Sequence, residues 1–371
     1  MRHLIKPLAW VAPIVLTLAA GCTAERVDDS AEDPPTSLML APELSVWGGA
    51  LIRRDDGTWL GTALHDVDEF GVWRIDGDRK ATLIGRFPTG YHPDGVAVWD
   101  SDRFVVAVEG TRMYQFWRID DGRMRLEGEA EGPLPARDLV VADFDGDGLP
   151  DLVLAPYGGE ELALLWGQGG IGLSDAQSLP AGRSPWHPQI VDWDGDGRPD
   201  LLWAELDTGV VRLARNLGAR RFEVEAVHGV SGVTPRHLAA RDLSGDGRPD
   251  LVAIAVEIGA AELLTPRSDG GLEVAKLPPV GALGYVAAAI LADGTILLAE
   301  EGRVILARAV GAEWEKRTLP AGSLPSPIEL FDVDGDGEED LVVYGSARSG
   351  VIIHFGPLWE RAEPLGIVQA P

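Results

Sequence analysis

The sequence predicts an all-β protein, a seven-bladed β-propeller of four-stranded antiparallel sheets. Three observations predict it. A nine-residue acidic motif begins at positions 143, 192, 242 and 332, and a short apolar run follows each copy. Further strand-like segments separate the copies and helical signals are nearly absent, while 46 glycines and 26 prolines suit many turns. Radial stacking buries both faces of each small sheet and leaves only short edges. A parallel β-helix is the alternative architecture, but its repeats are usually shorter.

The spacing of the turns gives the number of blades. The gap from 242 to 332 spans two units, and ILADGTILLAEE around Asp293 supplies the intervening turn without the carboxylates. Upstream, the segments around Asp56 and Asp100 are degenerate turns before β-rich runs. Turns therefore lie near 56, 100, 145, 194, 244, 293 and 334. Ring closure stays open, because either a strand around 38–40 or the segment WERAEPLG at 359–366 could complete the last blade.

The repeated motif has the composition of a calcium loop. In DWDGDGRPD, residues 192–200, carboxylates occupy the first, third, fifth and ninth positions and glycines the fourth and sixth. Calcium takes six to eight oxygens at about 2.3–2.6 Å, which a tight loop supplies from alternate side chains and a backbone carbonyl. Glycine at the sixth position allows the sharp turn. We therefore predict Ca²⁺ as a bound ion.

An EF-hand shares the opening of this loop but closes with a bidentate glutamate at the twelfth position, between helices. The four copies have residues there that cannot ligate through their side chains, and β-rich sequence follows each one. These residues are Leu154, Trp203, Ala253 and Val343. The EF-hand interpretation therefore fails.

The block D-x-D-G-D-G-x-x-D-L-V, in units of about 45 to 50 residues, resembles the FG-GAP or VCBS repeat of integrin α-subunit propellers and bacterial surface proteins. The resemblance covers most of residues 43–371, but only four units carry the motif. It implies Ca²⁺ in the loop that joins the first and second strands of a blade. The implied ligands, with the seventh residue acting through its carbonyl, are Asp143, Asp145, Asp147, Leu149 and Asp151; Asp192, Asp194, Asp196, Arg198 and Asp200; Asp242, Ser244, Asp246, Arg248 and Asp250; and Asp332, Asp334, Asp336, Glu338 and Asp340.

The third site departs from the pattern at Ser244. A hydroxyl is neutral and a poorer calcium ligand than a carboxylate, so we expect this site to be the weakest. Clustered carboxylates repel one another without a cation. The ions are therefore expected to stabilise the loops rather than to take part in chemistry.

The N-terminus is typical of an exported lipoprotein. Residues 1–21 combine a basic start, an apolar middle and small residues, as in a signal peptide. LAAGC resembles a bacterial lipobox, in which Cys22 becomes the lipidated first residue; the alternative is an ordinary signal peptide that leaves a free thiol. Cys22 is the single cysteine, so no intrachain disulfide can form. Residues 22–42 are predicted to be a flexible acidic tether, and 43–371 the propeller. Thr23 favours the bacterial outer membrane, on an undetermined side.

The charge excludes some partners. The formal charge of −27 becomes −29 once Arg2 and Lys6 leave with a signal peptide. Binding to nucleic acid or anionic lipid needs basic patches, so we expect no nucleic acid and membrane contact only through the anchor. We expect a monomer.

A ligand face is expected near the propeller axis, opposite the calcium loops. First strands begin there, and the residues six and five positions before a loop are polar or aromatic. With neighbours from the degenerate units, the candidates are Tyr91, His92, Arg137, Trp186, His187, Arg236, His237 and Tyr285. Asp138 lies beside Arg137. The alternative is that they line a wet channel without a ligand.

The 12 tryptophans could indicate sugar binding, because aromatic faces stack on sugars. However, Trp193 occupies a loop position filled elsewhere by Phe144, Leu243 and Val333. Trp73 and Trp117 lie in the similar segments VWRID and FWRID. Both patterns favour packing within and between blades.

No catalytic motif is present, such as a nucleophile elbow, HExxH or P-loop. The sequence therefore favours a non-enzymatic, calcium-stabilised lipoprotein of the cell envelope that binds an unidentified protein or glycan in interaction or adhesion. Alternatives are a propeller-based enzyme that degrades polysaccharides, resembling some lyases, and an envelope assembly factor. Fold alone does not decide among them.

Overall fold

The computed structural model describes residues 34–156, 158–229, 235–255, 260–267, 271–277, 286–311 and 313–369, without the side chains of Pro235, Arg236, Ala255, Ala260 and Gln369. The predicted signal peptide, Cys22 and Tyr285 lie outside the described residues, as does the side chain of Arg236. None of the described helices is both long and apolar enough to span a membrane. One compact unit extends from Pro35 to the C-terminus.

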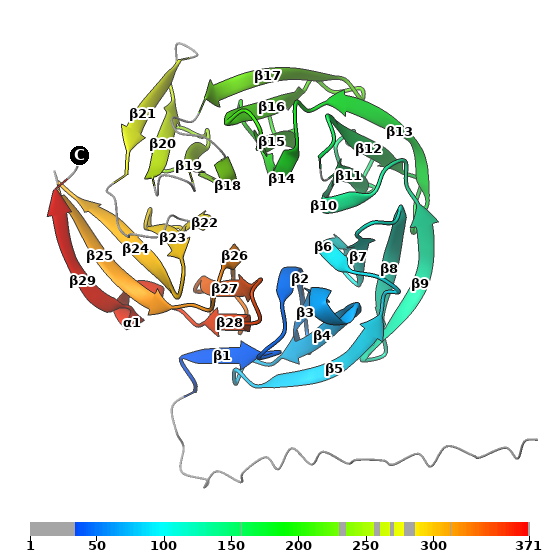
Figure 1. The fold of residues 1–371 in the computed structure, drawn as a ribbon, viewed down its shortest axis with the longest axis horizontal. Coiled ribbons are helices and arrows are strands. Elements are labelled where there is room, and N and C mark those ends of the chain that lie inside the picture. Colours follow the sequence, from blue (N-terminus) through cyan, green and yellow to red (C-terminus); the bar gives the residue numbers. More distant parts are fainter. Residues whose placement is uncertain are drawn as a thin grey trace, which may run out of the picture. The chain divides into compact units, whose positions relative to one another are not determined.

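Seven antiparallel sheets stand around a central axis in this unit (Figure 1), which confirms the predicted propeller. Strand order runs outward from the axis. Blades 1 to 3 consist of β2 (Val46–Arg54), β3 (Gly57–Leu64), β4 (Glu69–Ile75) and β5 (Ala81–Pro88); β6 (Pro93–Asp100), β7 (Arg103–Val108), β8 (Met113–Asp120) and β9 (Arg123–Glu131); and β10 (Ala136–Ala142), β11 (Asp151–Pro156), β12 (Glu161–Gly167) and β13 (Leu173–Pro180).

The remaining blades follow the same order. Blades 4 to 7 consist of β14 (Pro185–Val191), β15 (Asp200–Glu205), β16 (Val210–Asn216) and β17 (Phe222–Gly229); β18 (Pro235–Arg241), β19 (Asp250–Ala255), β20 (Ala260–Pro266) and β21 (Leu272–Lys276); β22 (Ala287–Ile290), β23 (Ile296–Glu300), β24 (Arg303–Val310) and β25 (Glu313–Pro320); and β26 (Pro325–Phe331), β27 (Asp340–Gly345) and β28 (Gly350–His354) with an outer strand from elsewhere in the chain. All seven predicted turns join first to second strands.

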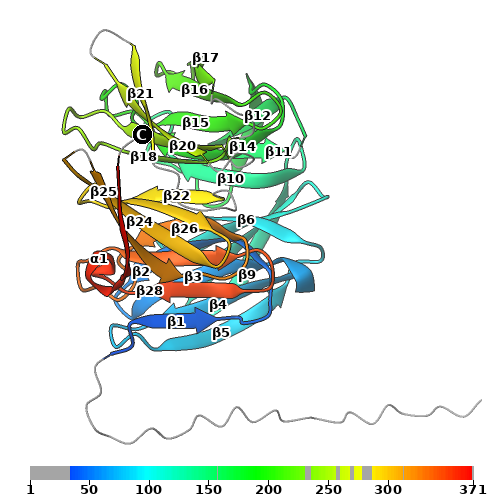
Figure 2. The same cartoon turned by 60° about the vertical axis from the view of Figure 1, so that its left-hand side comes forward.

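That outer strand comes from the N-terminal side of the chain and closes the ring. Strand β1 (Ser37–Leu40) pairs antiparallel with β28, and Leu40 lies opposite Val351 (Figure 2). The ring therefore begins at Ser37, inside the segment 22–42 that the sequence predicts as a tether. The acidic composition of that segment obscured the short apolar stretch SLML. In the structure, Leu40 at its end is buried against the last blade.

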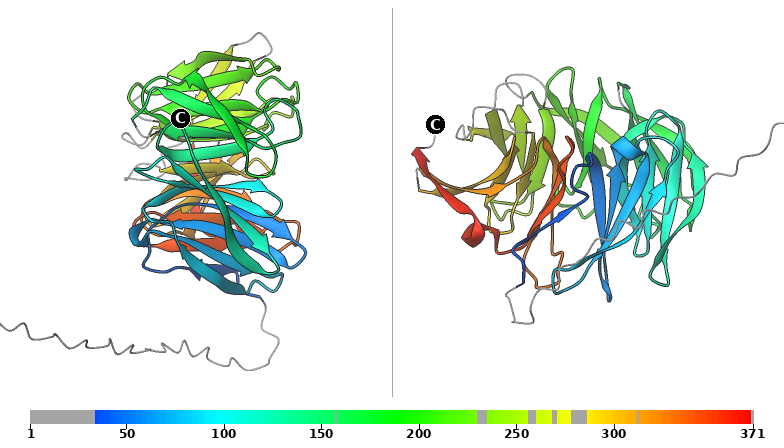
Figure 3. Two further views of the ribbon diagram at one scale, coloured as in Figure 1. Left: turned by 90° about the vertical axis from the view of Figure 1, so that its right-hand side faces the viewer. Right: turned by 60° about the horizontal axis from the view of Figure 1, so that its bottom comes forward.

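The segment WERAEPLG does not form the fourth strand of the last blade. It contributes to helix α1 (Leu358–Arg361) and strand β29 (Glu363–Gln369), which pairs with β25 as a fifth strand of blade 6. Leu358 and Trp359 are buried against blades 6 and 7. The packing of α1 thus directs the chain back to the neighbouring sheet (Figure 3, right).

The core consists of seven apolar clusters, one at each interface between adjacent blades. Trp73 packs between blades 7 and 1, and Trp117 between blades 1 and 2. Trp193 packs against the cluster between blades 4 and 5. These three tryptophans serve packing, as the sequence predicts.

The two ends of each first strand lie at different faces of the disc. Its last residue enters the turn to the second strand, and near its beginning a β-bulge interrupts the register. Bulges occur in six first strands of the described part: β2, β6, β10, β14, β18 and β26. A bulge leaves residues outside the ladder and changes the direction of their side chains. The two ends are therefore considered separately.

Candidate functional site

The four acidic loops share one hydrogen-bond pattern. The first-position aspartate accepts hydrogen bonds from the N–H groups of the fourth-position and sixth-position glycines. In the second loop, Asp192 accepts from Gly195 and Gly197, both at 2.9 Å. The corresponding bonds in the other loops span 2.6–3.2 Å. Gly195 and Gly197 have φ of 76° and 83°, which favours glycine at these positions.

In three of the four loops, the ninth-position aspartate attaches the loop to its blade. Asp200 is buried and accepts hydrogen bonds from the N–H groups of Trp193 at 2.9 Å and Asn216 at 2.7 Å. The first N–H lies in the loop and the second at the end of the third strand. Asp151 and Asp340 make the equivalent pair of bonds. These carboxylates therefore tie loop, second strand and third strand together.

The carboxylates of three loops converge closely enough to hold an ion. Their oxygens lie within 4.8 Å of one another in the sets Asp143, Asp145 and Asp151; Asp192, Asp194 and Asp200; and Asp332, Asp334 and Asp336. Such donor sets fit Ca²⁺, which prefers oxygen ligands. The described atoms of the third loop, which contains Ser244, form no such set. The seventh-position residues predicted to ligate through carbonyls, Leu149, Arg198, Arg248 and Glu338, donate their N–H to the fifth-position aspartate at 2.8–3.0 Å.

Arginines already offset part of the charge in these loops. Arg220, from the next blade, lies 2.6 Å from Asp145. Arg79 of blade 1 lies 2.6 Å from Asp334 and 3.3 Å from Asp336 in the last blade. A cation in the loops would therefore share the carboxylates with guanidinium groups that link adjacent blades.

Burial raises the pKa of the ninth-position aspartates that attach three of the loops to their blades. It raises the pKa of Asp151 and Asp200, although backbone N–H groups oppose the change. It raises the pKa of Asp340 to about 6, with a smaller contribution from Asp334 and Asp336. These carboxylates are less acidic than usual because nearby acids and burial both disfavour charge.

At the other end of the first strands lies a cavity of about 880 Å³ on the axis, which we call the axial cavity. Its lining includes residues from the bulges of β2, β6, β10, β14, β18 and β26. The polar or aromatic members from these bulges and their flanks are Trp47, Asp94, Arg137, Asp138, Trp186, His187, His237 and Ser326. Side chains from separate blades thus converge on one space.

A cation stack occupies one side of the axial cavity. The guanidinium of Arg137 lies 4.6 Å from the ring centre of Trp47 and 4.3 Å from that of Trp186. The ring of His65 stacks on Trp47 at 4.5 Å. A guanidinium and an imidazole therefore both pack on Trp47, so this ring is not a free platform for a sugar.

A hydrogen-bonded chain of two histidines and a carboxylate lies on another side. The N–H of Ala288 donates to Nδ1 of His237 at 3.3 Å, so neutral His237 carries its hydrogen on Nε2. This nitrogen lies 2.8 Å from Nε2 of His187, whose Nδ1 lies 2.9 Å from Asp138. When both histidines are neutral, every N–H therefore donates in the same direction, from Ala288 through His237 and His187 to Asp138.

The two histidines have opposite shifts in pKa. Burial lowers the pKa of His187, but the neighbouring Asp138 outweighs burial and leaves it raised. Burial and the facing His187 lower the pKa of His237 well below its usual value. Nearby, burial raises the pKa of Glu329 to about 7, although Tyr344 donates to its carboxylate at 2.8 Å. Groups poised near neutral pH suit proton transfer.

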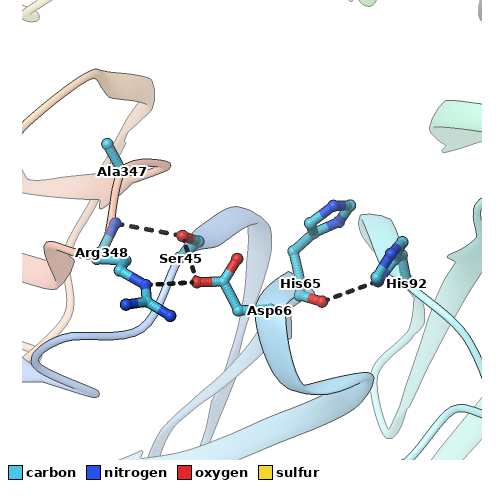
Figure 4. A pocket seen from close by; sticks show the side chains of 6 residues that line it. All are labelled: Ser45, His65, Asp66, His92, Ala347 and Arg348. Atoms are coloured by element: carbon cyan, nitrogen blue, oxygen red, sulfur yellow. Dashed lines mark hydrogen bonds and ion pairs between the residues drawn. The ribbon is translucent and has the colours of Figure 1, made fainter.

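A second, open pocket lies beside the axial cavity and is lined by Ser45, His65, Asp66, His92, Ala347 and Arg348 (Figure 4). Nδ1 of His92 lies 3.1 Å from the carbonyl oxygen of His65, and the two rings stack at 4.4 Å. Arg348 and Ser45 both donate to Asp66, at 3.2 and 2.8 Å.

The structure brings together four of the eight predicted ligand-face residues: Arg137, Trp186, His187 and His237 line the axial cavity. His92 lines the open pocket, and Tyr91, which is 47% exposed, packs beside it. Tyr285 and the side chain of Arg236 lie outside the described part.

Trp47, Asp94 and Glu329 also line the axial cavity but were not predicted from the sequence. Trp47 and Asp94 stand at the bulge position of blades 1 and 2, where no intact acidic loop gives the register. Glu329 follows the bulge of β26, and Gln189 follows that of β14 by a similar distance. Counting back from the intact loop at 332 could have found Glu329.

Comparisons with known proteins agree with this architecture. A family model described as an FG-GAP-like repeat matches residues 143–203 and 192–253. No curated protein matches the chain significantly. Among solved structures, a streptogramin B lyase has a TM-score of 0.54 at 13% identity, covering 86% of this chain and 95% of that chain.

Two further structures are similar. Virginiamycin B lyase from Staphylococcus aureus has a TM-score of 0.57 at 14% identity, over 85% of this chain and 97% of its own. A protein from B. thetaiotaomicron, described as the extracellular domain of a one component system, has a TM-score of 0.57 at 12% identity over 86% of this chain and 39% of its own. Such low identities establish the fold alone. The chain is therefore a seven-bladed β-propeller that contains FG-GAP-like repeats over residues 143–253.

Proposed function

We propose that this protein is an exported, calcium-stabilised lipoprotein of the bacterial cell envelope that binds a ligand in its axial cavity. The observation that carries the proposal is the cavity of about 880 Å³, into which six separate bulges bring polar and aromatic side chains. Ligand sites are usually concave, with a few convergent polar groups on an otherwise apolar wall. The lipobox at Cys22 and the acidic tether support attachment at the outer membrane.

Calcium has a supporting part in this proposal. The candidate ions lie at the loop ends of the first strands, away from the bulges. Asp151, Asp200 and Asp340 each join a loop to two strands, so an ion that orders one of these loops also orders its blade. The residues that would hold it are those of the three converging sets, with the loop containing Ser244 as a weaker site.

The lining favours a polar ligand, with a glycan or a protein segment as the chemical classes. Acidic Asp138 and Glu329 supply acceptors, while Arg137 supplies donors. Arg137 and His65 both pack on the Trp47 ring, so polar contacts rather than stacking on this ring would provide specificity.

A glycan array and a pull-down from envelope extracts test the proposal. The protein is compared with the double variant Asp138→Asn and His187→Gln, which keeps side-chain volume but removes the ion pair at 2.9 Å. The matched control is His228→Gln, a histidine paired with Glu262 at 3.0 Å outside the cavity. We expect a bound glycan or protein to be lost in the double variant and kept in the control; binding that survives in both variants would contradict the proposal.

A second candidate function is favoured by the histidine chain. His237, His187 and Asp138 form a directed path for a proton, and Glu329 has a pKa of about 7. A polysaccharide lyase needs a base that removes a proton next to a carboxyl group, and this arrangement could supply one. Incubation with soluble polysaccharides, followed by chain-length analysis, separates the candidates. Cleavage that disappears in His187→Gln would replace the binding proposal with the enzymatic one.

A further inference from the structure

An imidazole and two carboxylates meet at the rim of the axial cavity, where His65 follows β3, Asp94 lies in the bulge of β6, and Glu109 follows β7. Their ligand atoms all lie within 4.8 Å of one another. We call this set the rim triad. It is remote in the fold from the acidic loops, because it lies at the bulge end of the strands.

Asp94 in the rim triad is buried without satisfied hydrogen bonds. Its side chain is 3% exposed, and neither carboxylate oxygen has a hydrogen-bond partner among the described atoms. Both oxygens form ion pairs instead, one with Nδ1 of His65 at 2.9 Å and the other with Nε of Arg137 at 3.6 Å. A buried carboxylate in this state is costly unless a cation binds it.

The surroundings of His65 hold its ring in place. Trp47 stacks on the ring at 4.5 Å and His92 at 4.4 Å (Figure 4 shows His65 beside His92). The side chain is 16% exposed, and it lines the open pocket. A ligand histidine that cannot rotate loses little entropy when it binds a metal.

We propose that His65, Asp94 and Glu109 form a binding site for a transition-metal ion of the zinc type, separate from the calcium loops. Zinc accepts imidazole nitrogen together with carboxylate oxygen, whereas calcium prefers oxygen alone. Three protein ligands leave a fourth position of a tetrahedral ion free. That position is available to water or to a polar group of a ligand. The site does not depend on the ligand-binding proposal.

Arg137 provides the competing explanation. With protonated His65 it could neutralise Asp94 and Glu109 without any metal. Its guanidinium, however, is held between Trp47 and Trp186, and its Nε stays 3.6 Å from Asp94. The experiment must therefore distinguish a metal site from an ion-pair cluster.

The test measures zinc binding to the full-length purified protein carrying Cys22→Ser, which removes the thiol as an alternative zinc ligand. Calcium is kept in excess to saturate the acidic loops. We expect one zinc ion per chain, and a loss of affinity of at least about tenfold in His65→Gln, Asp94→Asn and Glu109→Gln, since each removes a direct ligand. The control His228→Gln has an equivalent histidine–carboxylate pair at 3.0 Å outside the triad and should keep wild-type affinity.

Two further measurements distinguish the loss of a zinc ligand from the misfolding of a variant. Thermal unfolding without zinc shows whether Asp94→Asn is folded, and Glu109→Gln changes a less buried residue. Anomalous diffraction at the zinc edge should place the ion about 2.0–2.2 Å from His65 and the two carboxylates. Absence of zinc binding, wild-type zinc affinity in all three variants, or an ion found only in the acidic loops would each overturn the proposal.

Discussion

The two ends of the first strands follow different rules. At the loop end, the four acidic loops repeat the same carboxylates and glycines, except at Ser244, and the same pair of hydrogen bonds to the first aspartate, as the bonds to Asp192 illustrate. At the bulge end, the backbone repeats its irregularity, but the side chains differ from blade to blade: Trp47, Asp94, Arg137 and His187. Repetition of both backbone and side chain indicates a structural task. Repetition of the backbone alone gives each blade a separate contribution to one cavity.

Removal of calcium is expected to have the largest effect, because it acts on several loops together. At a free concentration about 100 times Kd, each bound ion stabilises the folded state by about 2.7 kcal/mol. Chelation with EGTA should therefore lower Tm by about 10 °C or more. Differential scanning calorimetry with and without EGTA checks this. An unchanged Tm would mean that the hydrogen bonds and arginines hold the loops unaided.

Substitution of an attaching aspartate comes next. Asp200→Ala leaves the N–H groups of Trp193 and Asn216 without their acceptor. Each unpaired buried group costs about 1–3 kcal/mol, so unfolding free energy should fall by about 3 kcal/mol even without calcium. The control Asp194→Asn changes an exposed loop residue and should matter only when calcium is present. Denaturant titrations in calcium and in EGTA separate the effects of the two variants. If Asp200→Ala and Asp194→Asn lowered the unfolding free energy equally in EGTA, Asp200 would have no structural role apart from calcium.

At the bulge end, the expected effect of replacing Glu329 on the free energy of unfolding depends on pH. Burial raises the pKa of Glu329 from 4.5 to about 7, so the folded protein holds this proton more tightly than the unfolded chain. Its contribution to stability is fully present below pH 4.5 and is lost as the pH rises through about 7. Glu329→Gln stays neutral, so its stability relative to wild type should increase by about 2–3 kcal/mol between pH 5 and 8. Glu225→Gln, on an outer strand, serves as control; parallel pH profiles for wild type and Glu329→Gln would contradict the assignment.

The smallest effect is expected in the third loop. Ser244→Asp restores the missing third-position carboxylate and should raise calcium affinity there by several-fold, with less than about 1 kcal/mol change in stability. Asp194→Ser in the second loop is the reverse change and should weaken that site. Calcium titration calorimetry checks both; an unaltered third site would show that Ser244 does not limit it.

The loop end could be predicted because its chemistry is local. Nine consecutive residues contain both the carboxylates and the glycines that fold them back, so the motif from Asp192 to Asp200 defines the turn and the strand after it. The spacing of these motifs then located the degenerate turns near Asp56, Asp100 and Asp293, and all three join first to second strands.

The bulge end could be predicted only in part because its contacts join distant residues. Arg137 and His187 were found by counting back from intact loops, whereas Asp94 belongs to a blade without one. The closing strand β1 lies more than 300 residues from its partner β28, and no local pattern joins Leu40 to Val351. The predicted tether consequently extended too far.

A count of the calcium ions bound to metal-free protein tests the central claim most directly, namely that the acidic loops are cation sites and the degenerate turns are not. Equilibrium dialysis with elemental analysis provides that count. The account predicts four ions per chain, three bound tightly and one weakly at the loop containing Ser244. A protein that binds no calcium, or one whose Asp192→Asn, Asp194→Asn variant binds as many ions as wild type, would contradict it.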